Sequence, residues 1–190
     1  MDLYMEDQSA ISRLKQGDLD ALEHLVERYQ VKAVHAAYLI LHDRLLAEDV
    51  VQTAYIRVAK RIHQFNDGRP FAPWFYRIVI NDALKLTKKH KRSLSFEEQM
   101  EESTVQIAQQ LADSNPNPEE IVVNNENRQA VLKAIKSLPP GQRAVIVQQY
   151  YLDKSMSEMS AELELPLSTI KWWLRDARAR LRRMLVNPLG

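Results

Sequence analysis

The sequence predicts an all-α protein made of two small helical domains joined by an acidic flexible linker. Apolar residues recur at the three-to-four-residue spacing of amphipathic helices through most of the 190 residues. Only four glycines are present, which argues against β-hairpins and against glycine-rich loops that bind phosphate. Charged residues are also segregated into blocks of one sign. We therefore expect domains at residues 1–92 and 118–190, with the linker at residues 93–117.

The net charge of +1 hides four blocks of alternating sign. Residues 1–56 carry a net charge of −5, and residues 57–92 carry +8. Residues 93–127 contain eight acids and no base, and residues 128–190 return to +6. This alternation is typical of a protein that grips a polyanion at two places and a basic partner elsewhere. Ordinary surface charge is the alternative, but it does not explain why the blocks coincide with the segment boundaries.

The first domain begins with two predicted helices. A short helix over residues 9–16 ends at Gly17, and Asp18 is placed to cap the next helix. Residues 19–41 then carry apolar side chains at helical spacing. A short break is expected at residues 42–44.

The next helix has an apolar stripe and a charged face, because an α-helix turns about 100° per residue. Asp49, Gln52 and Arg57 point away from the stripe, and Ile56 lies among them. A turn at residues 66–70 follows, and a fourth helix is expected to start around Pro73. The stripe comprises Ala47, Val51, Ala54, Tyr55, Val58 and Ile62.

The second domain is expected to contain four more helices. Pro118 suits the first position of a helix, and Leu-Pro-Pro-Gly ends that helix twenty residues later. Ser155 and Glu158 have the spacing of a capping box, and Ser168 is placed to cap the last helix. The predicted helices cover residues 118–137, 143–152, 156–163 and 168–186.

The stretch from Arg57 to Arg92 combines ten basic residues with aromatic rings. Single-stranded nucleic acid requires this combination, since cations pair with phosphates and flat rings stack on exposed bases. The alternative is that the rings belong to the core, which is the commoner fate of any single aromatic residue. The rings are Phe65, Phe71, Trp74, Phe75 and Tyr76.

The last three predicted helices contain a helix-turn-helix pattern, in which the second helix is rich in bases. Residues 168–186 hold six bases and one acid. Trp172, Arg175 and Asp176 are expected to face outward near the start of the last helix, where a recognition helix meets base edges. Arginine pairs with guanine, and aspartate accepts from cytosine. The predicted packed stripe is Ile170, Leu174, Ala177, Leu181 and Leu185.

Two ordered sets of residues resemble one protein family. Ala47-Glu48-Asp49-x-x-Gln52, the pair Phe65 and Phe71, and Trp74-Phe75 with Asn81 resemble region two of the extracytoplasmic-function sigma factors. Those are small bacterial sigma subunits of RNA polymerase. Leu138-Pro139-Pro140-x-x-Arg143, Ser157-Glu158-Met159-Ser160 and Leu167-Ser168-Thr169-Ile170-Lys171 resemble region four of the same family. The chain departs from the usual pattern at Trp172-Trp173, at Asp176 and at Ala83-Leu84-Lys85.

The resemblance implies a cytoplasmic transcription initiation factor that binds core RNA polymerase and promoter DNA, and that is not an enzyme. The polymerase contacts would be the clamp helices of the largest subunit and the flap. The protein would melt the −10 element, with a flipped base held by the loop at residues 65–69, and read the −35 element as duplex. The acidic linker would occupy the RNA exit path, and an anti-sigma protein is expected as a further partner.

The resemblance also assigns residues to each surface, and it implies no cofactor, metal site or small-molecule substrate. Polymerase would contact Glu48, Asp49, Gln52, Ile56 and Arg57. The −10 element would contact Lys60, Phe65, Asn66, Asp67, Arg69, Trp74, Arg77, Asn81, Lys85 and Lys88. The −35 element would contact Arg143, Ser168, Thr169, Lys171, Trp172, Arg175, Asp176 and Arg178.

Three other functions compete with this interpretation. A regulator that binds duplex DNA without polymerase has no need of the basic, aromatic-rich stretch at residues 65–88. An enzyme is disfavoured because the sequence lacks HExxH, Walker and GxSxG motifs and has no cysteine. His35 and His42, seven residues apart, are more simply read as ordinary histidines. A helical adaptor without a nucleic-acid role does not explain the block of +8. The acidic start and the lack of a long apolar run predict neither a secretory signal nor a membrane helix.

Overall fold

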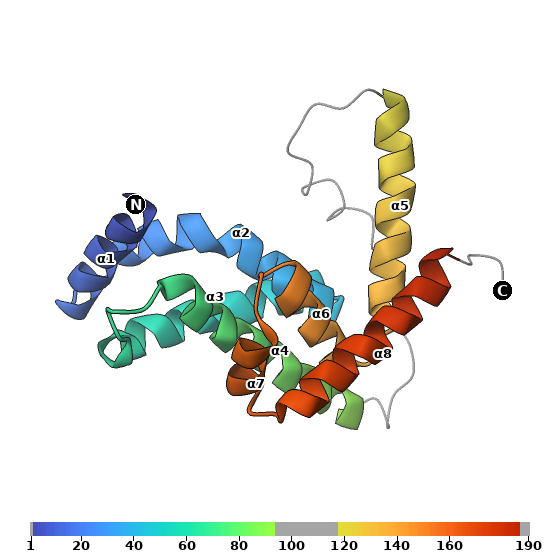
Figure 1. The fold of residues 1–190 in the computed structure, drawn as a ribbon. Coiled ribbons are helices and arrows are strands. Elements are labelled where there is room, and N and C mark those ends of the chain that lie inside the picture. Colours follow the sequence, from blue (N-terminus) through green and yellow to red (C-terminus); the bar gives the residue numbers. More distant parts are fainter. Residues whose placement is uncertain (1, 94–117, 187–190) are drawn as a thin grey trace.

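The computed structural model describes residues 2–93 and 118–186, with side chains described for residues 6–89 and 127–186. Every regular element within those ranges is helical, which confirms the all-α prediction (Figure 1). The elements are α1 (Asp2–Lys15), α2 (Ala21–Leu41), α3 (Arg44–Arg61), the 3-10 turn η1 (Ile62–Gln64), α4 (Phe71–Ser93), α5 (Pro118–Lys136), α6 (Pro140–Tyr150), α7 (Met156–Leu163) and α8 (Leu167–Val186).

Helices α2, α3 and α4 form the N-terminal bundle, and α1 packs across the end of α2 (Figure 1). The predicted stripe of α3 lies inside this bundle, and each of its six members is at most 6% exposed. Rings from α4 fill the centre, where Phe71 and Phe75 stack 5.6 Å apart and Phe75 stacks on Tyr55 at 4.5 Å. Burial of these rings contributes strongly to stability, because aromatic side chains remove a large apolar area from water.

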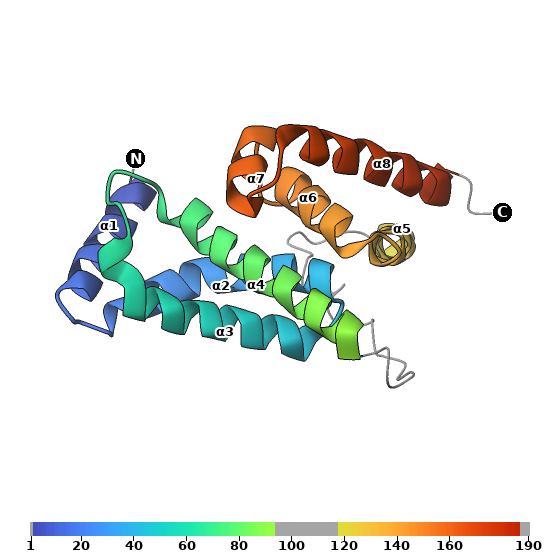
Figure 2. The same ribbon diagram turned by 90° about the horizontal axis from the view of Figure 1, so that it is seen from below.

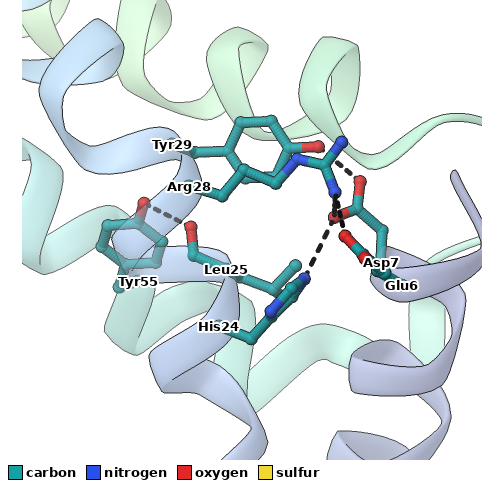
Figure 3. Close-up of polar contacts among 7 residues, drawn as sticks. All are labelled: Glu6, Asp7, His24, Leu25, Arg28, Tyr29 and Tyr55. Atoms are coloured by element: carbon teal, nitrogen blue, oxygen red, sulfur yellow. Dashed lines mark hydrogen bonds and ion pairs between the residues drawn. The ribbon is translucent and has the colours of Figure 1, made fainter. Parts of the chain in front are cut away.

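A buried carboxylate fixes α1 against α2. Asp7 is 5% exposed and accepts hydrogen bonds from the Tyr29 hydroxyl and, at 3.0 Å, from Arg28 Nη1 (Figure 3). Burial, together with the hydrogen bond to Asp7, raises the pKa of Tyr29, so the phenol remains a proton donor. A buried charge is tolerated only when it is paired, and Arg28 supplies the pairing here.

Several helices begin earlier than the sequence predicted. The first begins at Asp2 rather than residue 9, α4 begins at Phe71 rather than Pro73, and α6 begins at Pro140 rather than residue 143. Pro73 and Pro140 both fit inside a first turn, because the N–H groups of that turn have no helical partner.

The predicted caps fared unevenly. Asp18 is not the N-cap of α2, because that position is occupied by Asp20. The Oδ1 of Asp18 instead accepts a hydrogen bond from the backbone N of Asp20, 3.1 Å away, in the turn that precedes the helix. Ser168 lies inside the first turn of α8 instead of capping it. The capping box of Ser155 and Glu158 is confirmed.

Helix α6 is buried on two faces and joins the two groups of helices. Val145 and Ile146 pack in the buried cluster that α6 forms with α7 and α8, called here the C-terminal core. Ala144 and Val147 pack in the buried cluster of helices α1 to α4, called here the N-terminal core. Figure 2 shows α6 lying between α8 and the pair formed by α2 and α4. The Tyr151 hydroxyl lies 3.3 Å from His35 Nδ1 of α2 and adds a polar contact to this junction.

Most of the expected linker at residues 93–117 lies outside the described residues. None of the helices in the described ranges combines the length and the apolar composition needed to cross a membrane.

Candidate nucleic-acid interface

A cavity of about 210 Å³ with a mixed polar and apolar lining lies where the end of α3 meets α4. Its lining combines cations, two amides and one indole, which are the groups that bind phosphates and an unstacked base. Four of the predicted −10 residues meet here, together with Arg57, which the sequence assigned to polymerase. The structure adds Arg61, Gln64, Ile78 and Asp82, which the sequence reading did not single out. The predicted residues in the lining are Trp74, Arg77, Asn81 and Lys85.

Arg57 turns toward α4 and forms an ion pair with Asp82, with 2.7 Å between Nη1 and Oδ2. Lys85 Nζ lies 3.8 Å from the other carboxylate oxygen of Asp82. Asp82 therefore neutralises part of the charge in the cavity and fixes the position of Arg57. The local sequence gave no signal for this pair, because the two residues come from different helices.

Trp74 forms one wall of the cavity, and its ring packs against the rings of two phenylalanines. Its ring centroid lies 5.1 Å from that of Phe65 and 5.8 Å from that of Phe71. Phe65 is only 4% exposed, so its ring belongs to the core and not to the surface that the resemblance assigned to a flipped base. Such ring contacts limit the orientations open to the indole.

The loop after η1 is exposed and is held in place by α1. Lys15 Nζ donates to the Phe65 carbonyl at 3.0 Å and to Asp67 Oδ1 at 2.7 Å. Gln8 Nε2 donates to the Asp67 carbonyl at 2.8 Å, and Asn66 Oδ1 accepts from Gly68 N at 2.9 Å. Lys15 and Gln8 thus position the loop, a role that only the packing of α1 reveals. Six predicted −10 residues lie outside the cavity lining: Phe65 is buried, and the other five are exposed, namely Lys60, Asn66, Asp67, Arg69 and Lys88.

Helix α7 stands beside the cavity and contacts two of its residues. Asn81 Nδ2 donates to the backbone carbonyl of Glu162 at 3.2 Å, and Arg77 Nη2 lies 3.6 Å from Glu164 Oε1. A strand that binds Asn81 and Arg77 must displace these contacts. In this arrangement the cavity is therefore only partly available.

The outer face of α3 carries a separate surface. Asp49, Gln52 and Ile56 are exposed there, and the side chain of Ile56 is 56% exposed. Glu48 pairs with Arg44 at 2.8 Å, so its charge is already satisfied. Leu45, one turn before Asp49, is 73% exposed and extends the same face. The helical spacing of residues 45, 49, 52 and 56 was the sequence signal that could have assigned Leu45 to this exposed face.

The helix-turn-helix is formed by α7 and α8, and the start of α8 faces outward (Figure 2). Lys171, Trp172 and Arg175 are exposed. Trp173 instead turns inward over Gly141, where an added Cβ would lie 2.6 Å from the indole. Glycine is required at that position because the ring occupies the space of a side chain.

Asp176 does not point freely into solvent as the helical wheel predicted. Its Oδ2 accepts from Gln142 Nε2 at 2.8 Å and from Arg180 Nε at 2.9 Å. These hydrogen bonds, that of Gln142 above all, hold the pKa of Asp176 below its usual value. Asp176 therefore ties α8 to α6 through Oδ2, and only its other carboxylate oxygen has no hydrogen bond to another described residue.

The remaining predicted −35 residues occupy different environments. Arg178 is exposed, and its Nη2 donates to Gln149 at 2.8 Å. Arg143 is half-buried, and burial lowers its pKa. Ser168 is exposed and Thr169 is partly buried. The packed stripe of α8 ends at Leu181, because Leu185 is 40% exposed.

Comparisons with known proteins agree with this arrangement. The models of sigma-70 region 2 and sigma-70 region 4 match residues 25–93 and 128–181, respectively. The chain is 32% identical over 177 residues to the ECF RNA polymerase sigma factor SigW of Bacillus subtilis, covering 92% of this chain and 94% of the relative. It is 30% identical over 189 residues to the ECF RNA polymerase sigma-E factor of Escherichia coli strain K12, covering 97% and 96%.

Two solved structures share the fold. CnrH, solved in complex with the cytosolic domain of CnrY, superposes with a TM-score of 0.62 at 23% identity, covering 95% of this chain and 97% of CnrH. The sigma factor RpoE, solved in complex with the anti-sigma factor NepR from Bartonella quintana, gives a TM-score of 0.64 at 18% identity, covering 86% and 96%.

Proposed function

Because this chain belongs to the extracytoplasmic-function sigma factors, the RNA polymerase subunits of the sigma-70 family that its relatives represent, we propose that it directs core polymerase to promoters and opens them. Residues 1–92 bind polymerase and melt the −10 element, and residues 118–190 read the −35 element. Residues 93–117 connect the two. The protein acts in the cytoplasm, by binding rather than by catalysis.

The observation that supports this proposal most strongly is the cavity between α3 and α4. Trp74 stands there on a ring support, beside Arg61, Arg77 and Asn81. A duplex reader has no use for such a site, because bases in a duplex already stack on each other. Extruding a base costs a few kcal/mol, and stacking on an aromatic ring recovers about 1–3 kcal/mol.

Polymerase docking is assigned to the outer face of α3, with Leu45, Asp49, Gln52 and Ile56 at its centre. Two exposed apolar side chains flank one carboxylate and one amide there, opposite the buried stripe of the same helix. Arg57 is removed from this surface, because it is engaged with Asp82 in the cavity. An anti-sigma protein is proposed as a second partner, since one of the similar structures is a sigma factor bound to an anti-sigma factor.

Transcription with purified core polymerase on a genomic fragment library tests the function directly. We expect initiation from a restricted set of promoters that depends on this protein. Absence of any dependent start site would contradict the proposal. If the protein alone bound fragments as tightly as it does with polymerase, a stand-alone duplex-binding regulator would be the better description.

Asp49→Arg tests the docking face, because it places a cation where an exposed carboxylate now stands. We expect affinity for core polymerase to fall at least about tenfold, a change of roughly 1.4 kcal/mol. Glu27→Arg is the matched control, since Glu27 is an exposed carboxylate on a different helix, α2. Equal affinity of both variants for core, measured by fluorescence anisotropy, would show that α3 is oriented differently in the complex.

A further inference from the structure

Trp172 leaves much of a large apolar ring in water at the start of the basic helix α8. Its side chain is 51% exposed, although tryptophan is highly buried on average. The residue after it, Trp173, turns inward over Gly141 and packs against the C-terminal core. The exposure of Trp172 is therefore a property of its position on the helix and not of a loosely packed domain.

The C-terminal core does not need this indole. Ile170, Leu174 and Ala177 already form the buried stripe of α8, each at most 2% exposed. Trp172 lies on the opposite side of the helix, because two residues correspond to a rotation of about 200°. A residue that contributes little to packing and exposes a large ring is a candidate for a contact with a partner.

The charge around Trp172 identifies the kind of partner. Lys171 and Arg175 are exposed beside it, and neither forms a hydrogen bond or ion pair with another described residue. The one acid on this helix, Asp176, is occupied by Gln142 and Arg180. The surface around Trp172 therefore offers an indole and two cations unpaired among the described residues, which fits a polyanion with apolar groups on its accessible edge.

In duplex DNA the apolar group of the major groove is the C5-methyl of thymine. We propose that Trp172 selects thymine at one position of the duplex element read by α8, by packing its ring against that methyl group, while Lys171 and Arg175 contact the backbone and neighbouring bases. This inference rests on the proposed function, and it names a specificity contact at the position where the chain departs from the usual family pattern.

Replacement of thymine by deoxyuridine tests the contact, because the two bases differ only by the methyl group. Holoenzyme made from core polymerase and the full-length protein is bound to a promoter found in the library experiment, and each thymine of the upstream element is replaced in turn. We expect one position at which deoxyuridine weakens binding about fourfold, as expected for burial of one methyl group. Uniform insensitivity of the wild type would overturn the proposal.

Trp172→Ala connects the methyl effect to this residue. The variant is expected to bind the thymine promoter about as weakly as the wild type binds the deoxyuridine promoter, and to respond no further to deoxyuridine. Trp172→Phe keeps an apolar ring without the indole N–H, so it should retain part of the discrimination. Leu185→Ala removes another exposed apolar side chain from the far end of α8 and should discriminate as the wild type does.

Two results separate this inference from the proposed function. If the wild type initiates transcription but Trp172→Ala discriminates thymine from deoxyuridine as the wild type does, the contact is absent and the function stands. If Trp172→Ala instead weakens holoenzyme assembly with core in the absence of DNA, Trp172 contacts protein and the thymine assignment is wrong. If no variant and no wild type initiates, the proposed function itself fails.

Discussion

Trp74 and Trp172, the two tryptophans assigned to the proposed DNA surfaces, differ in the protein groups that support their rings. Trp74 on α4 rests on Phe65 and Phe71 and is partly buried against the N-terminal core. Trp172 on α8 is 51% exposed and lies on the side of its helix away from the core. Both stand among cations.

This difference matters for what each ring does. A ring that stacks on a single-stranded base must hold one orientation before the base arrives, because ordering it during binding costs side-chain entropy. The ring contacts of Trp74 provide that order. A ring that meets a methyl group in a rigid duplex groove needs less support from the protein, since the groove restricts it from the other side.

The two basic surfaces also differ in accessibility. Helix α7 contacts Asn81 and Arg77 beside the cavity, whereas the start of α8 faces outward (Figure 2). The proposed duplex-reading surface is therefore accessible in this arrangement, whereas contacts with residues 162 and 164 occupy part of the proposed strand-binding cavity.

Trp74→Ala should produce the largest effect and separate the two tryptophans most clearly. Loss of a ring that packs against Phe65 and Phe71 is expected to lower the free energy of unfolding by about 2–4 kcal/mol, whereas Trp172→Ala should change it by less than about 0.5 kcal/mol. Urea denaturation measures both values. Where Trp74→Ala remains folded, permanganate footprinting should show closed promoter complexes that fail to open.

Trp74→Phe is the control for that experiment, because it keeps a ring on the same support. It should recover most of the stability and part of the opening. Equal stability losses at Trp74 and Trp172 would show that the contrast in ring support has no energetic meaning.

Acidification should weaken the junction that keeps α7 beside the cavity. Burial, together with the positive charges of Arg143 and Lys136 across the junction, lowers the pKa of His42 to about 3. An unfolded histidine titrates near pH 6.5. Between these values the unfolded chain binds a proton that the folded chain does not, so the free energy of unfolding should fall by at most about 1.4 kcal/mol per pH unit. His35 acts in the same direction, since burial and the charges of Arg128 and Arg44 lower its pKa.

His42→Asn tests this origin. Asparagine tolerates the left-handed backbone of this position, where φ is 57°, and does not titrate. Urea denaturation between about pH 7.5 and about pH 5.5, a range above the carboxylate pKa values, should give a shallower pH slope for the variant. Identical slopes would exclude His42 as the source.

Glu164→Gly should have a small effect of the opposite sign. Glu164 ends α7 with φ of 55°, a conformation that favours glycine. Its ion pair with Arg77 is worth little, because the side chain of Glu164 is 84% exposed. We expect the variant to be more stable by about 0.5–1 kcal/mol. Glu164→Gln keeps the backbone strain and removes the charge, so a gain of the same size there would assign the effect to loss of the carboxylate charge and not to the backbone.

The sequence by itself determined the properties that follow from local periodicity and from the order of motifs. The spacing of Ala47, Val51 and Val58 identified the buried face of α3, and the position of Trp172 identified an outward ring. The capping box at Ser155 was also readable, since both of its partners lie three residues apart. The family resemblance extended over both domains, and the comparisons show the same family.

Only the tertiary structure decided which residues from different helices meet. Phe65 lies under Trp74 rather than on the surface, Arg57 turns to Asp82, and Gln142 occupies Asp176. The two-sided burial of α6 was also invisible in the sequence. The physical reason is that helical periodicity specifies which face of a helix is apolar, whereas a hydrogen bond or ring contact between helices depends on distances of a few ångströms that only the packing of the whole chain sets.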